Sequence, residues 1–375
     1  MALTRIVTSS DATRASLTAK RAKGGCMRLV VAVSLFLGVS WANAAEVRIV
    51  QQDVTIDGAD SGVKLFVRSK MAAGAKPTND NVVLFIHGAT FPSTPDFDLQ
   101  FQDYSWADWM VRHGWVVFMF DVRNYGGSSH EAAMSQPAVA SRPLSRAYLA
   151  VRDIGSVLDH IRAKSAVDRV SLVGWSWGAM TAGFYTSLHS ERVRKLVMYA
   201  PIYNYPEHPT RGAGSKLQNK RRPWEFAYET MGAYRLSTAT DLQAFWDGQI
   251  PTADKSQFRD QAVVDAFNAA VLATDSTSGT RSPPSVRAPN GCLEDDFLVA
   301  TGRPFWSASS IYVPVLVIAG EFDADSFPVD REGLIRELTN APVKRSVMVK
   351  NATHFLFLEK ARFELFDAVN AFLKE

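Results

Sequence analysis

A serine between two glycines is the residue whose surroundings most clearly favour chemistry. The string Gly174-Trp175-Ser176-Trp177-Gly178 fits the pattern G-x-S-x-G, follows the apolar run VSLV and precedes the helix-like stretch AMTAGFYTSLH. A sharp turn from a strand into a helix lifts the serine hydroxyl off the sheet, and the N-terminus of the helix favours developing negative charge. Because the string stands in this context, we predict that Ser176 is a nucleophile.

A serine hydroxyl is a poor nucleophile until a base takes its proton, so a histidine is expected nearby. Of the seven histidines, His354 lies after the last predicted strand and before the last predicted helix, where the carboxyl ends of the strands gather. Three others lie on or at the ends of amphipathic stretches, two lie in other loops, and His87 belongs to a separate motif. We predict that His354 is the base.

A carboxylate should hold the imidazole in one tautomer and stabilise its charged form. The apolar run VPVLVIAG ends at Gly320 and is followed by EFDAD. Asp323 stands at the carboxyl edge of this predicted strand, Asp325 is its rival two residues further on, and Glu321 is a weaker candidate. We predict that Asp323 is the acid.

Acyl transfer also needs donors for an oxyanion. One donor is expected to be the backbone N–H of Trp177, the residue after the serine. The second is expected to be the Ala89 N–H, because His87-Gly88-Ala89-Thr90 follows the apolar run VVLFI and its glycine lets the backbone approach a substrate closely. His87 is then structural and hydrogen-bonded behind the loop.

Short β-branched runs alternate with longer amphipathic stretches, which predicts an α/β fold with a mostly parallel central sheet flanked by helices. The predicted strands are 47–56, 63–68, 82–86, 115–120, 170–173, 195–199, 313–318 and 346–349. The predicted helices outside the long interval described next are 105–112, 146–163, 177–188, 331–337 and 360–372.

A long interval interrupts this alternation between the strand ending at Tyr199 and the strand opening at Val313. Because it is too long for a connecting loop, we predict a helical cap over residues 202–310, inserted into a core of residues 45–201 and 311–375. Helices are expected near 224–231, 241–247 and 257–273.

Some side chains of the cap and of the loops around Ser176 are expected to contact the substrate. The candidates are Thr90, Trp175 and Tyr203, whereas most aromatic residues of the cap are expected to form its own core. A basic cluster in the cap has two readings, a solvated surface or an attraction for a carboxylated substrate, and it comprises Lys216, Lys220, Arg221 and Arg222.

The net charge of +3 comes from the N-terminal segment. Residues 1–44 contain six of the 41 basic side chains and one of the 38 acidic ones, which leaves 35 basic and 37 acidic over 45–375. A nucleic-acid-binding body is therefore not expected, because such domains carry their charge on the folded surface. The two cysteines, Cys26 and Cys292, do not form a metal-ligand pattern, and we expect no metal and no organic cofactor.

The N-terminal segment also carries an export pattern. Arg28 precedes the apolar run LVVAVSLFLGV, and the A-x-A exit of a signal peptide ends at Ala44. Residues 1–44 are therefore predicted to be a leader, with the signal proper at 27–44 and either Met1 or Met27 as the start. The apolar run is too short for a stable membrane anchor, which needs about 20 residues. The mature protein is expected to be periplasmic or secreted.

With these motifs in their order, the chain resembles the α/β-hydrolase superfamily, in its cap-bearing serine-hydrolase (esterase- or lipase-like) branch. The resemblance rests on His87-Gly88, on DVRNYGGS at 121–128, on the 174–178 string, on GEFD at 320–323 and on Thr353-His354-Phe355. Two positions depart from the usual pattern. Asn124 stands where glycine is frequent, and tryptophan flanks the serine on both sides, where Trp177 is expected to narrow the acyl pocket as in haloalkane dehalogenases.

The sequence therefore predicts an exported serine hydrolase that cleaves a carboxylic ester through an acyl-enzyme. The expected partner is a small ester-like molecule with an apolar or aromatic part, and the oligomeric state is left open. The same residues would also serve a lactonase, an amidase or aminopeptidase, or a C–C bond hydrolase. A non-catalytic binding protein of the same fold is a further alternative.

Overall fold

A computed structural model of the chain describes residues 47–203 and 210–375. Residues 46–375 form one compact unit. The predicted leader, residues 1–44, lies outside the described residues.

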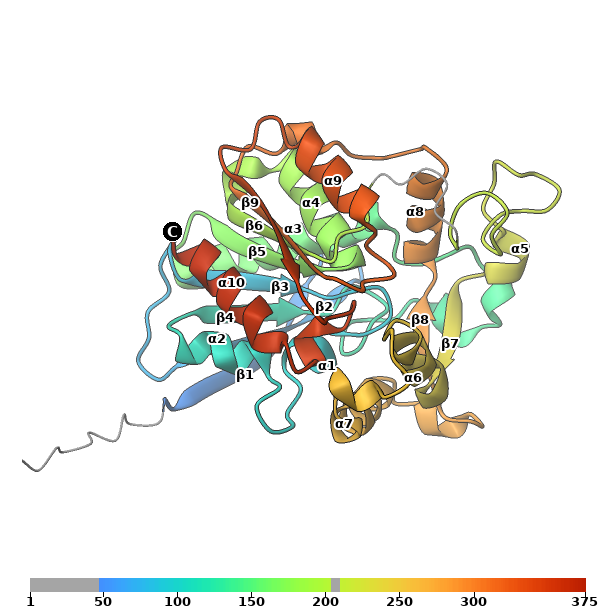
Figure 1. The fold of residues 1–375 in the computed structure, drawn as a ribbon, viewed down its shortest axis with the longest axis horizontal. Coiled ribbons are helices and arrows are strands. Elements are labelled where there is room, and N and C mark those ends of the chain that lie inside the picture. Colours follow the sequence, from blue (N-terminus) through green and yellow to red (C-terminus); the bar gives the residue numbers. More distant parts are fainter. Residues whose placement is uncertain (1–46, 204–209) are drawn as a thin grey trace, which may run out of the picture. The chain divides into compact units, whose positions relative to one another are not determined.

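An eight-stranded sheet forms the centre of this unit (Figure 1). β1 pairs antiparallel with β2, and β2 pairs antiparallel with β4, whereas all other neighbours are parallel. The predicted mostly parallel sheet is confirmed. In their order across the sheet the strands are β1 (Ile49–Asp57), β2 (Lys64–Ala72), β4 (Val116–Phe120), β3 (Val82–Ile86), β5 (Val170–Trp175), β6 (Val193–Tyr199), β9 (Val315–Gly320) and β10 (Lys344–Val349).

Helices cover both faces of the sheet because its central strands are apolar on both sides. In β3, Val83 and Phe85 join one hydrophobic cluster, while Val82, Leu84 and Ile86 join the other. The first cluster includes side chains of α1 (Ser93–Phe97), α2 (Trp106–Arg112) and α10 (Arg362–Lys374). The second includes side chains of α3 (Ala147–Ser165), α4 (Trp177–Leu188) and α9 (Pro328–Glu337).

The interval between β6 and β9 supplies a separate group of elements (Figure 1). They are α5 (Tyr228–Met231), β7 (Tyr234–Thr238), α6 (Ala239–Asp247), α7 (Gln261–Ala273), β8 (Ser285–Pro289) and α8 (Gly291–Ala300). We call residues 202–310 the cap. The helices expected there occur, but β7 and β8 pair as an antiparallel two-stranded sheet that the sequence analysis did not predict. Each has only five residues, and β8 includes a proline, which weakens a strand signal.

None of the helices within 47–203 and 210–375 combines the length and the apolar character needed to cross a membrane.

A buried ion pair anchors the loop after β4 to helix α3. The Arg123 Nε donates to Asp153 Oδ2 at 3.0 Å, and the Arg123 backbone N–H donates to the same oxygen at 3.1 Å. The Asp153 side chain is fully buried, and Asp60, which also pairs with Arg123, is partly exposed. The pair fixes the start of the 121–128 loop, which supports the site described below.

Removing this anchor should destabilise the fold. Asp153→Ala leaves the buried guanidinium of Arg123 without its buried partner, and we expect the free energy of unfolding in urea to fall by about 3–5 kcal/mol. Asp159→Ala is the matched control, because Asp159 lies on the same helix, is 68% exposed and pairs with Arg192. An exposed pair contributes at most about 1 kcal/mol, so equal losses in the two variants would contradict the role of Asp153.

Candidate active site

Ser176 lies at a strained turn between β5 and α4. Its backbone has φ 57° and ψ −122°, a region that residues other than glycine rarely occupy. The turn is fixed because the Ser176 N–H donates to the Tyr199 carbonyl of the neighbouring strand β6 at 2.9 Å. The predicted strand–turn–helix context of this serine is therefore present.

Close backbone contacts explain the two glycines of the turn. A Cβ on Gly174 would lie 2.3 Å from the Gly178 carbonyl oxygen, and a Cβ on Gly178 would lie 2.2 Å from the Ile86 carbonyl oxygen. Such distances leave no room for a methyl group. The turn is thus packed directly against the end of β3, where the loop that contains Ala89 begins.

The structure brings His354 and Asp323 together. The His354 Nδ1 lies 2.9 Å from Asp323 Oδ1, and both side chains are buried. The same Asp323 oxygen accepts the backbone N–H groups of Asp325 and Ser326 at 2.9 and 2.8 Å. These two donors fix the carboxylate beyond the end of β9.

The charges of this pair reinforce each other. Burial alone would raise the pKa of Asp323, but the neighbouring His354 and the backbone donors lower it below the usual 3.8. Burial alone would lower the pKa of His354, but Asp323, with a smaller effect of Asp325, raises it above the usual 6.5. Because an ionised Asp323 can only accept, the neutral imidazole carries its proton on Nδ1 and leaves Nε2 open.

Asp325, the rival acid, lies on the other side of the ring. Its Oδ2 is 3.8 Å from His354 Nε2, and its Oδ1 accepts from Arg211 Nη2 at 2.6 Å. Asp325 is therefore placed beside Nε2, whereas Asp323 contacts Nδ1, the opposite nitrogen.

His87 supports the second predicted donor loop. Its Nε2 accepts the Val122 N–H at 3.0 Å, so the ring proton is on Nδ1, which donates to the Gly88 carbonyl at 2.8 Å. That carbonyl belongs to the same peptide group as the Ala89 N–H, and the hydrogen bond polarises the N–H. Burial lowers the pKa of His87, which keeps the ring neutral.

The next carbonyl of this loop is held by the core and by the cap. The Ala89 carbonyl accepts from the Tyr125 hydroxyl at 2.6 Å and from Arg235 Nη2 at 3.0 Å. Tyr125 follows Asn124, whose φ of 68° explains why this position often favours glycine and tolerates asparagine. Arg235 comes from β7 and was not singled out in the sequence, because its strand was not predicted.

The cap also holds the loop that contains His354. Trp246 of α6 donates from Nε1 to Glu359 Oε1 at 2.9 Å, and the other Glu359 oxygen accepts the Thr353 N–H at 2.8 Å. Gln249 accepts the His354 N–H at 3.1 Å. The cap is thus linked by hydrogen bonds to both loops that flank Ser176.

A cavity of about 280 Å³ is lined by Ser176, His354 and Ala89. The predicted contact residues Thr90 and Trp175 also line it, and Lys216 is the member of the basic cluster that reaches it. The lining is mixed rather than uniformly apolar. The aromatic side chains on it are Phe91, Trp175 and Phe245, and the acidic and basic ones, apart from the His354 imidazole, are Arg211, Lys216, Arg235, Asp241, Asp296 and Asp325.

Two expectations need correction. The Tyr203 side chain does not line the cavity, because its hydroxyl donates to Glu337 and accepts the Ala308 N–H. Its neighbour Ile202 lines the cavity instead. The Trp177 indole is fully buried and donates to Asp295 at 3.1 Å, so it does not narrow the cavity.

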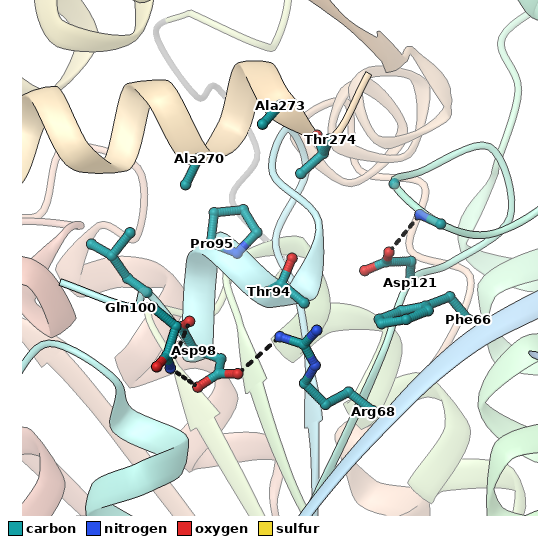
Figure 2. A pocket seen from close by; sticks show the side chains of 13 residues that line it. Phe66, Arg68, Thr94, Pro95, Asp98, Gln100, Asp121, Ala270, Ala273 and Thr274 are labelled. Atoms are coloured by element: carbon teal, nitrogen blue, oxygen red, sulfur yellow. Dashed lines mark hydrogen bonds and ion pairs between the residues drawn. The ribbon is translucent and has the colours of Figure 1, made fainter. Parts of the chain in front are cut away.

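A second hollow, of about 500 Å³, lies between β2, α1 and α7 (Figure 2). Its charged side chains are paired with one another or with backbone, since Arg68 donates to Asp98 at 3.0 Å and Asp121 accepts the Gly127 N–H at 2.8 Å. Neither Ser176 nor His354 lines it. Among the described residues, no group of three or more histidine, cysteine or acidic side chains is arranged to hold a metal ion.

A family model described as "alpha/beta hydrolase fold" matches residues 81–361. The chain therefore belongs to the α/β-hydrolase fold family, which places it among the hydrolases of that superfamily. A search of curated proteins finds no match.

Solved structures agree with this fold. The chain is similar to an esterase from Thermogutta terrifontis, with 17% identity, a TM-score of 0.55 and coverage of 86% of this chain and 98% of the esterase. It is also similar to an epoxide hydrolase from Vigna radiata, with 17% identity, a TM-score of 0.56 and the same coverages. An enol-lactonase from Burkholderia xenovorans LB400 is similar as well, with 16% identity, a TM-score of 0.54 and coverage of 86% of this chain and 100% of the lactonase. At these identities the likeness shows the fold alone.

The backbone contact at the serine turn generates a prediction about stability. Gly178→Ala places a methyl group against the Ile86 carbonyl. We expect the free energy of unfolding, measured in urea, to fall by about 1–3 kcal/mol. Gly155→Ala is the control, because a Cβ there meets only Tyr185, at 3.7 Å, inside helix α3. In the control, the free energy of unfolding should rise by about 0.4–1 kcal/mol, because alanine restricts the unfolded chain. A Gly178 variant as stable as the wild type would contradict the packing argument.

Proposed function

We propose that the protein is an exported serine hydrolase that cleaves carboxylic esters through an acyl-enzyme. One observation carries the proposal: Ser176, on its strained turn, lines the same cavity as His354, whose Nδ1 is held by Asp323 at 2.9 Å. The proposal assigns nucleophile, base and acid to these three residues.

In the proposed reaction, the Ser176 hydroxyl attacks the ester carbonyl while His354 Nε2 takes its proton. The resulting imidazolium, stabilised by Asp323, gives the proton to the leaving alcohol. Water then attacks the acyl-enzyme with His354 again as base, and the acid is released. The pair of Asp323 and His354 supports this assignment, because a buried carboxylate at Nδ1 favours the protonated ring that forms twice per cycle.

The N–H groups of Ala89 and Trp177 are proposed to bind the oxyanion. The Trp177 N–H opens helix α4 directly after the serine, and the Ala89 N–H belongs to the peptide polarised by His87. Losing one such donor typically costs about 10²- to 10³-fold in rate.

The first experiment tests the nucleophile. Purified residues 45–375 should hydrolyse nitrophenyl esters of rising chain length and be labelled by a fluorophosphonate probe. We expect Ser176→Ala to lose the label and to fall by about 10⁴-fold or more in kcat. A panel of lactones, aminoacyl anilides and vinylogous diketones identifies the preferred bond. Full activity in Ser176→Ala, or neither turnover nor labelling in the wild type, would refute the proposal.

Two isosteric variants then separate the candidate acids. Asp323→Asn should reduce kcat by about 10⁴-fold, because an amide no longer holds the tautomer that leaves Nε2 open. Asp325→Asn should be far milder, since Asp325 does not contact Nδ1. A larger fall in kcat in Asp325→Asn than in Asp323→Asn would assign the role of the acid to Asp325 instead of Asp323.

The pH dependence tests the charge beside Nε2. His354 must be neutral to accept the serine proton, so kcat/KM should fall as pH drops through a pKa raised above 6.5. Asp325→Asn removes one of the negative charges that raise this pKa and leaves the Arg211 cation less compensated. Both effects lower the pKa, so the acidic limb should move to lower pH. Asp241→Asn, an exposed acid on the same cavity, should leave the limb in place, and a shift upward in Asp325→Asn would contradict the assignment.

Export is proposed from the pattern of residues 27–44. Expression of the full chain in a Gram-negative host, followed by fractionation and N-terminal sequencing, should yield a periplasmic or extracellular protein that begins at Ala45. An unprocessed protein confined to the cytoplasm would exclude this part of the proposal.

A further inference from the structure

Two adjacent aspartates of α8 differ in how their oxygens are used. Asp295 accepts from Arg146 Nε at 2.6 Å, from the Ala147 N–H at 2.7 Å and from Trp177 Nε1 at 3.1 Å. Asp296 is 2% exposed and lines the cavity beside Ser176, yet its Oδ1 has no hydrogen-bond partner within residues 47–203 and 210–375. The first carboxylate is thus structural, whereas the second faces the cavity with an unused acceptor.

An unused donor lies next to this acceptor. Arg211 donates from Nη2 to Asp325, but its Nη1 lies 3.4 Å from Asp296 Oδ2 without a hydrogen bond to any part of the chain that the structure describes. Leaving a buried donor or acceptor unsatisfied is costly, so a cavity that contains both is prepared for a group that supplies the two missing partners.

We propose that Arg211 and Asp296 form a subsite for a neutral group that offers an acceptor and a donor side by side, such as the carboxamide of a substrate. This inference rests on the proposed ester hydrolysis and specifies its substrate class. The amide oxygen accepts from Arg211 Nη1, and the amide N–H donates to Asp296 Oδ1.

The mixed charges of the cluster favour a neutral polar ligand over an alkyl group or an ion. An alkyl group would cover both polar atoms and leave them unpaired. A carboxylate would pair with Arg211 but would meet the carboxylates of Asp296 and Asp325, and a cation would meet the guanidinium. Burial raises the pKa of Asp296 to about 6, and Arg211 opposes this shift because it stabilises the ionised carboxylate, in which Oδ1 accepts a hydrogen bond.

The position of the subsite assigns it to the alcohol part of the ester. In the proposed reaction the leaving oxygen takes its proton from His354 Nε2. Asp325 lies 3.8 Å from that nitrogen, and Arg211 joins Asp325 to Asp296 through contacts of 2.6 and 3.4 Å. The Ala89 loop, which would hold the carbonyl oxygen, belongs to a different element.

The test uses butyrate esters that differ only in the alcohol. Isobutyl and carbamoylmethyl butyrate are near isosteres, carboxymethyl butyrate carries an anion and 2-(dimethylamino)ethyl butyrate carries a cation. Each kcat/KM is divided by the rate of hydrolysis by hydroxide, and each ester is also measured as an inhibitor of nitrophenyl butyrate hydrolysis, so that binding without turnover is scored. We expect the carbamoylmethyl ester to exceed the isobutyl ester at least about tenfold.

Variants locate the origin of this preference. Asp296→Leu and Arg211→Met should each reduce the ratio of carbamoylmethyl to isobutyl ester severalfold, whereas Asp241→Asn should leave it unchanged because the Asp241 carboxylate already caps α6 through Thr238. When the amide is moved to the acyl side, the enzyme should not prefer ethyl succinamate to ethyl 4-methylpentanoate in corrected kcat/KM. If either variant fails to fold, the ratio of carbamoylmethyl to isobutyl ester in the wild type still tests whether the subsite exists.

The outcomes separate this inference from the proposed function. Suppose that nitrophenyl esters are hydrolysed and Ser176 is labelled, but the four butyrate esters give equal corrected kcat/KM values. The subsite is then refuted, and the proposed hydrolase function is retained. A preference for the anion, the cation or the acyl-side amide also overturns the subsite. Absence of both hydrolysis and labelling refutes the proposed function itself.

Discussion

The contact between the backbone of the serine turn and the end of β3 is the constraint on which the rest of the site depends. With Gly178 packed against the Ile86 carbonyl, the helix that begins after Ser176 and the loop that contains Ala89 are held at one separation. The strained φ of Ser176 is maintained by its hydrogen bond to β6 and by this close packing. The relative position of the serine hydroxyl and the two proposed oxyanion donors is therefore set by backbone atoms.

Buried polar groups extend this rigid centre outward in both directions. On one side, His87 connects the Gly88 carbonyl to the loop after β4, and Tyr125 of that loop holds the next carbonyl. On the other side, Glu359 ties the Thr353 backbone to Trp246 of the cap. The cap thus contributes Arg235 and Gln249 to loops of the core as well as lining the cavity. These contacts help to order the loops on either side of Ser176.

Local sequence signals predicted the core more accurately than the cap. The 174–178 string, the apolar runs before His87 and Gly320, and the position of His354 each depend on a few neighbouring residues, and parallel strands bring their carboxyl ends together. The cap lacks such signals. β7 and β8 form only because two short segments far apart in the chain pair with each other, and Tyr203 turned out to be held by Glu337 instead of facing the cavity.

The sequence by itself determined the fold family, the serine turn and the loops that carry Asp323 and His354, because each is encoded by an apolar strand followed at once by a polar motif. Only the tertiary structure decided which aspartate meets which nitrogen of His354, because this depends on the side-chain directions set by the turn at 323–326. It alone also showed that Arg211, Arg235 and Asp296 share one cavity with Ser176. These charges come from distant segments of the cap, and no local pattern indicates that packing brings them together.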